Sequence, residues 1–96
     1  REATVLVTNP THLAVALRYD QDETPLPLIL AKGEGALAES MMKAAREAGV
    51  PVMQNIPLAR ALTAQGEAGQ YIPSELIEPV AEVLRLLQQL DQQSPS

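Results

Sequence analysis

The stretch "LILAKGEGALAESMMKAAREAGVPVMQN", residues 28–55, decides the fold class of this chain. An apolar run over residues 28–31 predicts a strand, and an amphipathic pattern over residues 34–48 predicts a helix that stops at Gly49. The apolar face of that helix is expected to carry Leu37, Met41, Ala44, Ala45 and Ala48. "VPVMQN", residues 50–55, then predicts a second buried strand. This order indicates a βαβ unit with two parallel strands and a right-handed crossover.

Two further strands are expected before this unit. "TVLVT", residues 4–8, is rich in β-branched side chains and runs directly into an Asn-Pro pair, where a strand would end. "LAVALRYD", residues 13–20, alternates large apolar side chains with small or polar ones, which is typical of a strand. The sheet is therefore predicted to contain four strands that do not all run in the same direction.

The second half of the chain is predicted to be mainly helical. One helix begins at Pro57, and a helical turn after Pro73 leads through Pro79 into a longer helix. The buried stripe of that longer helix is expected to contain Val80, Val83, Leu84, Leu87 and Leu90. We therefore expect one α/β domain over residues 1–90, a small mixed four-stranded sheet surrounded by about four helices, and a flexible tail at residues 91–96.

The composition excludes several classes of function. A chain of 96 residues with 46% hydrophobic content, no Phe or Trp and two Tyr is expected to form one aliphatic core. The absence of cysteine excludes disulfides and thiolate ligands, and a single histidine excludes a multi-histidine metal site within the chain, so no metal or cofactor is expected. The net charge of −5 argues against nucleic-acid binding. No apolar run is long enough to span a membrane, and the sequence is typical of a domain excised from a longer protein.

"TNPTH", residues 8–12, allows two interpretations. Asn-Pro pairs are common in ordinary turns. Alternatively, the side-chain nitrogen of Asn9 can attack its own main-chain carbonyl, close a succinimide and expel the nitrogen of Pro10. Because proline has no N–H, the competing attack that causes deamidation is suppressed. In that case His12 could move a proton, and Thr11 could fix the turn or donate a hydrogen bond.

Four motifs occur in order across residues 4–87: "VTNPTHLAVALRYD", "ETPLPLILAKG", "IPLARAL" and "GQYIP". Together they strongly resemble the cytoplasmic domain of the FlhB/YscU family, the autocleaving switch proteins of flagellar and type III secretion export apparatus. The resemblance implies cleavage between Asn9 and Pro10 in an Asn-Pro-Thr-His motif that ends with Thr11 and His12. It also implies that the two fragments stay associated, and that the altered loop changes which export substrates are accepted.

The same resemblance implies a location at the cytoplasmic face of the bacterial inner membrane, reached through membrane helices that precede the domain. The implied partners are export-apparatus proteins, secreted substrates and a needle-length or ruler protein. "TPLPL", "IPLAR" and "QYIP" favour the virulence-associated injectisome branch over the flagellar one. Candidate partner surfaces are the cleft around residues 9–12 and the proline-rich stretch at residues 24–27.

Two hypotheses of different classes follow. In the first, the domain performs a single intramolecular cyclisation at Asn9, is not a turnover enzyme, and then acts by binding export components. In the second, the domain is a docking or adaptor module whose Asn-Pro turn stays intact. A hydrolase acting on external substrates has little support, because the sequence offers no clustered carboxylate pair and only one histidine.

Overall fold

The structure is a computed structural model, and it describes residues 3–93. In chain order, its elements are β1 (Val5–Asn9), β2 (Leu13–Arg18), β3 (Leu28–Glu34), α1 (Ala36–Ala48), β4 (Val52–Gln54), α2 (Ile56–Gln65), the short 3₁₀ helix η1 (Ser74–Leu76) and α3 (Ile77–Gln93). The strands form one sheet in the order β3-β2-β1-β4. The predicted mixed four-stranded sheet is confirmed, since β1 pairs antiparallel to β2 and parallel to β4, while β2 pairs antiparallel to β3.

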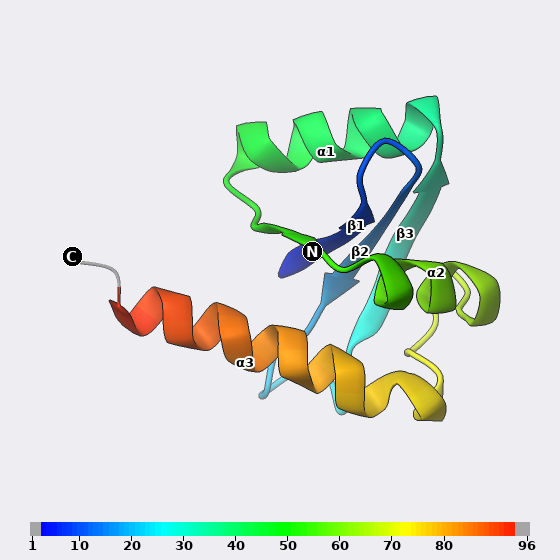
Figure 1. The fold of residues 1–96 in the computed structure, drawn as a ribbon. Coiled ribbons are helices and arrows are strands. Elements are labelled where there is room, and N and C mark those ends of the chain that lie inside the picture. Colours follow the sequence, from blue (N-terminus) through cyan, green and yellow to red (C-terminus); the bar gives the residue numbers. More distant parts are fainter. Residues whose placement is uncertain (1–2, 94–96) are drawn as a thin grey trace.

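The two strands of the predicted βαβ unit, β3 and β4, run in the same direction but are not neighbours. They form the two edges of the sheet, and the β1–β2 hairpin lies between them. The helix α1 connects one edge to the other, as Figure 1 shows. The parallel partner of β4 is therefore β1, through the register that places Val7 opposite Met53.

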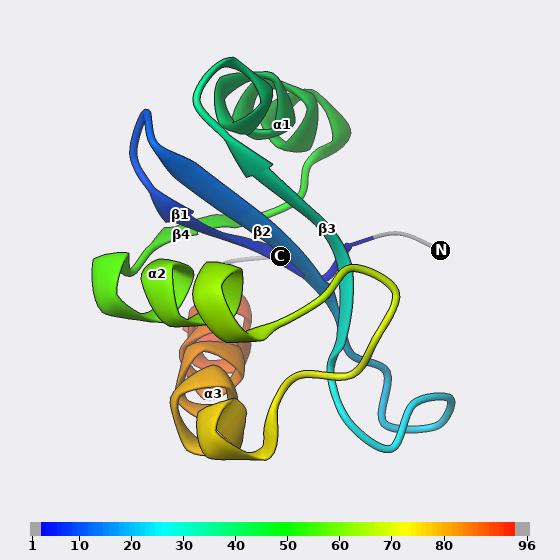
Figure 2. The same ribbon diagram turned by 90° about the vertical axis from the view of Figure 1, so that its right-hand side faces the viewer.

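The sheet is covered on both faces, by α1 on one side and by α2 and α3 on the other (Figure 2). Successive side chains of a strand point to opposite faces, so β1 contributes to both layers. Val5 and Val7 belong to the larger core beneath α2 and α3, whereas Leu6 belongs to the smaller core beneath α1. All three side chains are almost completely buried, as expected for a central strand.

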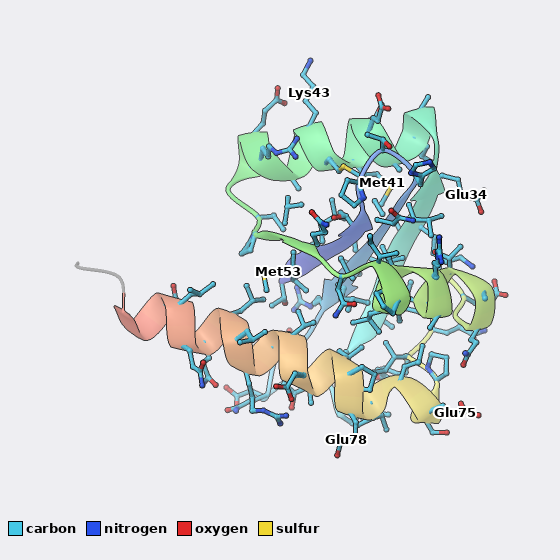
Figure 3. The ribbon with its side chains drawn as sticks, in the orientation of Figure 1. Glu34, Met41, Lys43, Met53, Glu75 and Glu78 are labelled. Carbon is cyan, nitrogen blue, oxygen red and sulfur yellow. The ribbon has the colours of Figure 1, made fainter. Side chains whose placement is uncertain are left out.

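The buried face of α1 differs in part from the predicted one, since Ala45 is buried and Met41 packs against the core as expected. Its buried residues are Ala38, Met42 and Ala45, whereas Leu37 is 56% exposed. The difference arises because Leu37 and Met41 lie over Gly33 of the edge strand β3 rather than over the centre of the sheet. Figure 3 shows Met41 on the sheet side of α1, with Lys43 pointing away from it. Small alanine side chains let the helix approach the sheet closely.

The predicted C-terminal turn and helix are joined, because η1 leads directly into α3. The helix begins before Pro79, which is tolerated in a first turn because the N–H that proline lacks has no helical acceptor there. Val80 is fully buried as predicted, but Leu90 is 57% exposed because the C-terminal half of α3 extends away from the sheet (Figure 1). The helix continues to Gln93, and residues 94–96 of the predicted tail lie outside the described residues. Within the described part of the chain, no helix is both long and apolar enough to cross a membrane.

The C-terminal end of α2 is held against β3 by two features. The Lys32 ammonium group donates to the carbonyl oxygens of Gly66, at 2.7 Å, and Thr63, at 3.2 Å. Gly66 itself is pressed so closely against β3 that a Cβ placed on it would overlap the Cδ1 atom of Ile29 and lie 2.9 Å from the carbonyl oxygen of Leu62. The absence of a side chain at Gly66 therefore permits this approach.

Gly66→Ala is expected to lower the free energy of unfolding by about 1–3 kcal/mol, because the added methyl group must displace Ile29 or the end of α2. Urea denaturation measures the change, with Glu67→Ala at the exposed neighbouring position as the control. Ile29→Val removes the atom that would clash. In the Ile29→Val chain, Gly66→Ala should lower the free energy of unfolding clearly less than it does in the unaltered chain. If the effects of the two substitutions simply add, this packing explanation is wrong.

Candidate functional site

The "NPTH" segment forms a tight connection between β1 and β2. Asn9 is the last residue of β1 and pairs with Leu13, the first residue of β2, so that residues 10–12 alone make the turn. The backbone N–H of His12 donates to the carbonyl oxygen of Asn9 at 2.9 Å. This carbonyl is the group that an Asn9 cyclisation would attack. The structure thus brings the four predicted residues together in one turn between paired strands.

Thr11 carries backbone strain within this turn. Its φ is 64°, and it is the one non-glycine residue with positive φ among residues 3–93. A β-branched residue rarely adopts this conformation, because its side chain crowds the backbone. The strain is held by the strands on either side and lies two residues from the Asn9 carbonyl.

The His12 ring turns back over the same loop. Its Nδ1 lies 3.0 Å from the carbonyl oxygen of Pro10 and 3.2 Å from the Thr11 hydroxyl oxygen. A carbonyl oxygen can only accept a hydrogen bond, so the contact with Pro10 is a hydrogen bond in the tautomer that carries the proton on Nδ1. The observed partner is the carbonyl of Pro10 and not its nitrogen, so this geometry favours an orienting role for the ring.

Both flanks of the turn are fixed by backbone donors from distant segments. The N–H of Asn55 donates to the carbonyl oxygen of Thr8 at 2.9 Å, and the N–H of Gly35 donates to the carbonyl oxygen of His12 at 3.0 Å. Asn55 also caps α2, because its side-chain oxygen accepts from the N–H of Leu58 at 3.1 Å. The turn therefore lies at the end of the sheet where α1 and α2 begin, which Figure 1 shows beneath the first turns of α1.

Gly35 and Asn55 were not among the site residues predicted from the sequence. The available signals were a glycine in the first turn of the predicted helix and an asparagine two residues before Pro57, and both residue types are common at helix starts. Their contacts with the turn depend on the pairing of strands and could not be read from the sequence. Within residues 3–93 there is also no group of three or more His, Cys, Asp or Glu side chains arranged to hold a metal ion.

The proline-rich stretch lies at the other end of β2, away from the turn. It forms one wall of a groove of about 590 Å³, and α3 forms the opposite wall. The apolar side chains of this groove include Pro25, Leu26, Pro27, Ile77, Ala81, Leu84 and Leu87, with Arg85 and Asp91 as charged members. None of residues 9–12 lines it, so the two candidate partner surfaces are separate.

Comparisons with known proteins identify the family of this chain. The model of the FlhB HrpN YscU SpaS family matches residues 1–87. The chain belongs to this family. It is 48% identical over 88 residues to the Yop proteins translocation protein U of Yersinia pestis, and 47% identical over 89 residues to the flagellar biosynthetic protein FlhB of Yersinia enterocolitica. These matches cover 92% and 93% of this chain but 25% and 23% of the relatives, so the chain spans about a quarter of their length.

The fold is also similar to that of a solved relative, the EscU C-terminal domain. That structure superposes with a TM-score of 0.85 at 44% identity, covering 88% of this chain and 85% of the solved one. It carries an asparagine replaced by alanine, and a second solved variant of the same domain carries the following proline replaced by alanine. The predicted family, sheet and arrangement of helices are thereby confirmed.

Thr11→Gly is expected to slow any reaction at Asn9 while leaving the fold about as stable as before. Glycine adopts positive φ freely, so the substitution removes strain of about 1–2 kcal/mol from the folded state. It also raises the conformational entropy of the unfolded chain, which favours unfolding by a similar free energy. Thermal unfolding measures stability, and intact mass against time measures chain cleavage. A variant that is cut as fast as the unaltered chain would show that strain at Thr11 has no part in the reaction.

Proposed function

We propose that this chain is the cytoplasmic switch domain of a type III export apparatus, which cuts itself once between Asn9 and Pro10. The observation that carries the proposal is the hydrogen bond from the His12 N–H to the Asn9 carbonyl oxygen in a turn fixed at both flanks. The N–H withdraws electron density from that oxygen and stabilises the charge that develops there during attack. Fixing the turn also supplies the orientation that an intramolecular reaction needs.

The proposed reaction is a cyclisation within Asn9. Its side-chain nitrogen forms a bond to its own carbonyl carbon and loses a proton, while the bond from that carbon to the nitrogen of Pro10 breaks and that nitrogen gains a proton. The products are fragment 1–9, which ends in a succinimide that water can open, and fragment 10–96, which begins with the proline amine. No external reactant is needed, and the domain turns over once.

The other two residues of the motif support this step by shaping the turn. The His12 ring, through its contact with the Pro10 carbonyl, orients the residue whose nitrogen departs. Thr11 contributes backbone strain, and its hydroxyl oxygen lies beside the same ring nitrogen. A proton can reach the departing nitrogen through water, since residues 10–12 are exposed to solvent.

The position of β1 supports the proposal that the two fragments remain associated. Fragment 1–9 contains the whole of β1, a central strand paired on both sides. Val5 and Val7 are fully buried in the larger core, so releasing the fragment would expose that core to water. Cleavage therefore changes the surface of the turn while the sheet stays assembled.

The proposed role in export rests on the family. Its members include a Yop translocation protein and a flagellar biosynthetic protein, which supports a place for this chain among export-apparatus components at the cytoplasmic face of the inner membrane. The cut turn is proposed to alter which secreted substrates are accepted and how the domain responds to a needle-length or ruler protein. The apolar groove beside residues 24–27 is proposed to contact short apolar segments of these partners.

Asn9→Ala should abolish cleavage, because alanine has no side-chain amide to attack the carbonyl. Intact mass under denaturing conditions measures this, with fragments 1–9 and 10–96 expected only from the unaltered chain. Pro10→Ala is the chemical control, since it restores the backbone N–H that permits deamidation. It should shift Asn9 from chain cleavage towards acid formation without cleavage. A folded, unaltered chain that stays intact would favour the docking module whose turn is never cut.

The cut domain should unfold at a temperature that rises with protein concentration, because unfolding releases fragment 1–9 as a separate molecule. The uncut Asn9→Ala chain unfolds as one molecule and should show no such dependence. Calorimetry of both forms over a wide concentration range makes the comparison. A cut domain whose melting temperature does not change with concentration would show that fragment 1–9 is not held as the structure indicates.

A further inference from the structure

We infer that Gly35 is a positioning residue for cleavage, acting through His12 on the Asn9 carbonyl. Gly35 lies between the end of β3 and the start of α1, outside the four residues of the motif, and its N–H donates to the carbonyl oxygen of His12 at 3.0 Å. The inference rests on the proposed self-cleavage. It adds a residue that the Asn-Pro-Thr-His motif does not contain.

Two backbone hydrogen bonds in succession connect Gly35 to the reacting group. Gly35 holds the carbonyl of His12, and His12 in turn donates its own N–H to the carbonyl oxygen of Asn9 at 2.9 Å. The β2–β3 register ends with Leu13 opposite Glu34, so the bond from Gly35 extends the ladder by one residue into the turn. A shift of Gly35 therefore moves the donor that polarises the reacting carbonyl.

The conformation of Gly35 explains why glycine is needed there. Its φ is 57° and its ψ is −126°, a combination that crowds the side chain of any L-amino acid. A Cβ at this position would meet no other atom within 4 Å, so the requirement comes from the backbone and not from neighbouring groups. Relaxation of φ towards negative values would rotate the peptide that carries the donating N–H away from His12.

The second anchor of the turn has no such requirement. Asn55 holds the carbonyl of Thr8 through its N–H, but its φ of −153° and ψ of 93° are ordinary extended values. Many residues could present the same N–H from that backbone. Of the two anchors, Gly35 is therefore the one whose identity controls the geometry of the turn.

The chain offers a matched control at the other end of the same helix. Gly49 caps the C-terminus of α1 with a φ of 77°, and a Cβ there would also meet no atom within 4 Å. Its N–H bonds to carbonyl oxygens of the last turn of α1 and does not touch the cleavage turn. Alanine at either glycine introduces strain at positive φ at one end of α1, but only Gly35→Ala affects the donor to His12.

The experiment uses the 96-residue chain made by chemical synthesis, stored in denaturant, and refolded at time zero. Intact mass against time gives the cleavage rate. Gly35→Ala is expected to slow cleavage by about tenfold, whereas Gly49→Ala stays within about twofold of the unaltered chain. D-alanine at position 35 favours positive φ and should restore the rate, because its backbone can keep the conformation that presents the N–H to His12.

A second measurement does not depend on cleavage. In chains that carry Asn9→Ala, amide hydrogen exchange of the His12 N–H reports whether the turn is held. Gly35→Ala should speed this exchange by about tenfold, and Gly49→Ala should not. Equal effects of the two alanine substitutions on both measurements, or failure of D-alanine to restore them, would overturn the inference. An unaltered chain that folds but is never cut would refute the proposed function, while the exchange measurement would still decide whether Gly35 positions the turn.

Discussion

The pairing of β1 on both sides is the constraint on which the rest of the structure depends. β1 contributes to both cores through its alternating side chains, with Val5 and Val7 on one face and Leu6 on the other. Its backbone pairs antiparallel with β2 on one side and parallel with β4 on the other. A strand fixed in this way cannot shift its register by one residue without exchanging its two faces. The turn that follows Asn9 therefore begins from a fixed point.

Local patterns in the sequence were sufficient to predict the elements, but not which strands are neighbours. Alternating and β-branched residues identified β1 and β2, and the helical period identified α1. The order of strands depends on which backbones meet in space. The periodicity of side chains along a strand does not indicate its neighbours, so the pairing of β1 with β4 could not be predicted. The face of α1 was misjudged for a related reason. Its orientation is set by the close approach at Gly33, a contact between segments that a helical pattern does not contain.

The candidate site likewise contains residues that the sequence predicts and residues that only the folded structure brings to the turn. Asn9, Pro10, Thr11 and His12 are contiguous, so the chemistry of an Asn-Pro bond could be recognised from the sequence alone. Gly35 and Asn55 reach the turn only through the folded sheet, and each resembles a helix cap when read locally. The strain at Thr11 was equally hidden, because a positive φ at threonine is imposed by the flanking strands and has no sequence signal.

The separation of the turn from the groove limits how a cut could act on export. The turn lies where α1 and α2 begin, whereas the groove lies between α3 and residues 24–27, at the opposite end of β2. The hydrogen bonds from Gly35 and Asn55 do not involve the Asn9–Pro10 bond. Breaking that bond would relax the strain at Thr11 without removing any strand from the sheet. The groove would then keep its shape. A partner that distinguishes the cut form from the intact one must accordingly contact the turn itself, or bridge from the turn to the groove along β2.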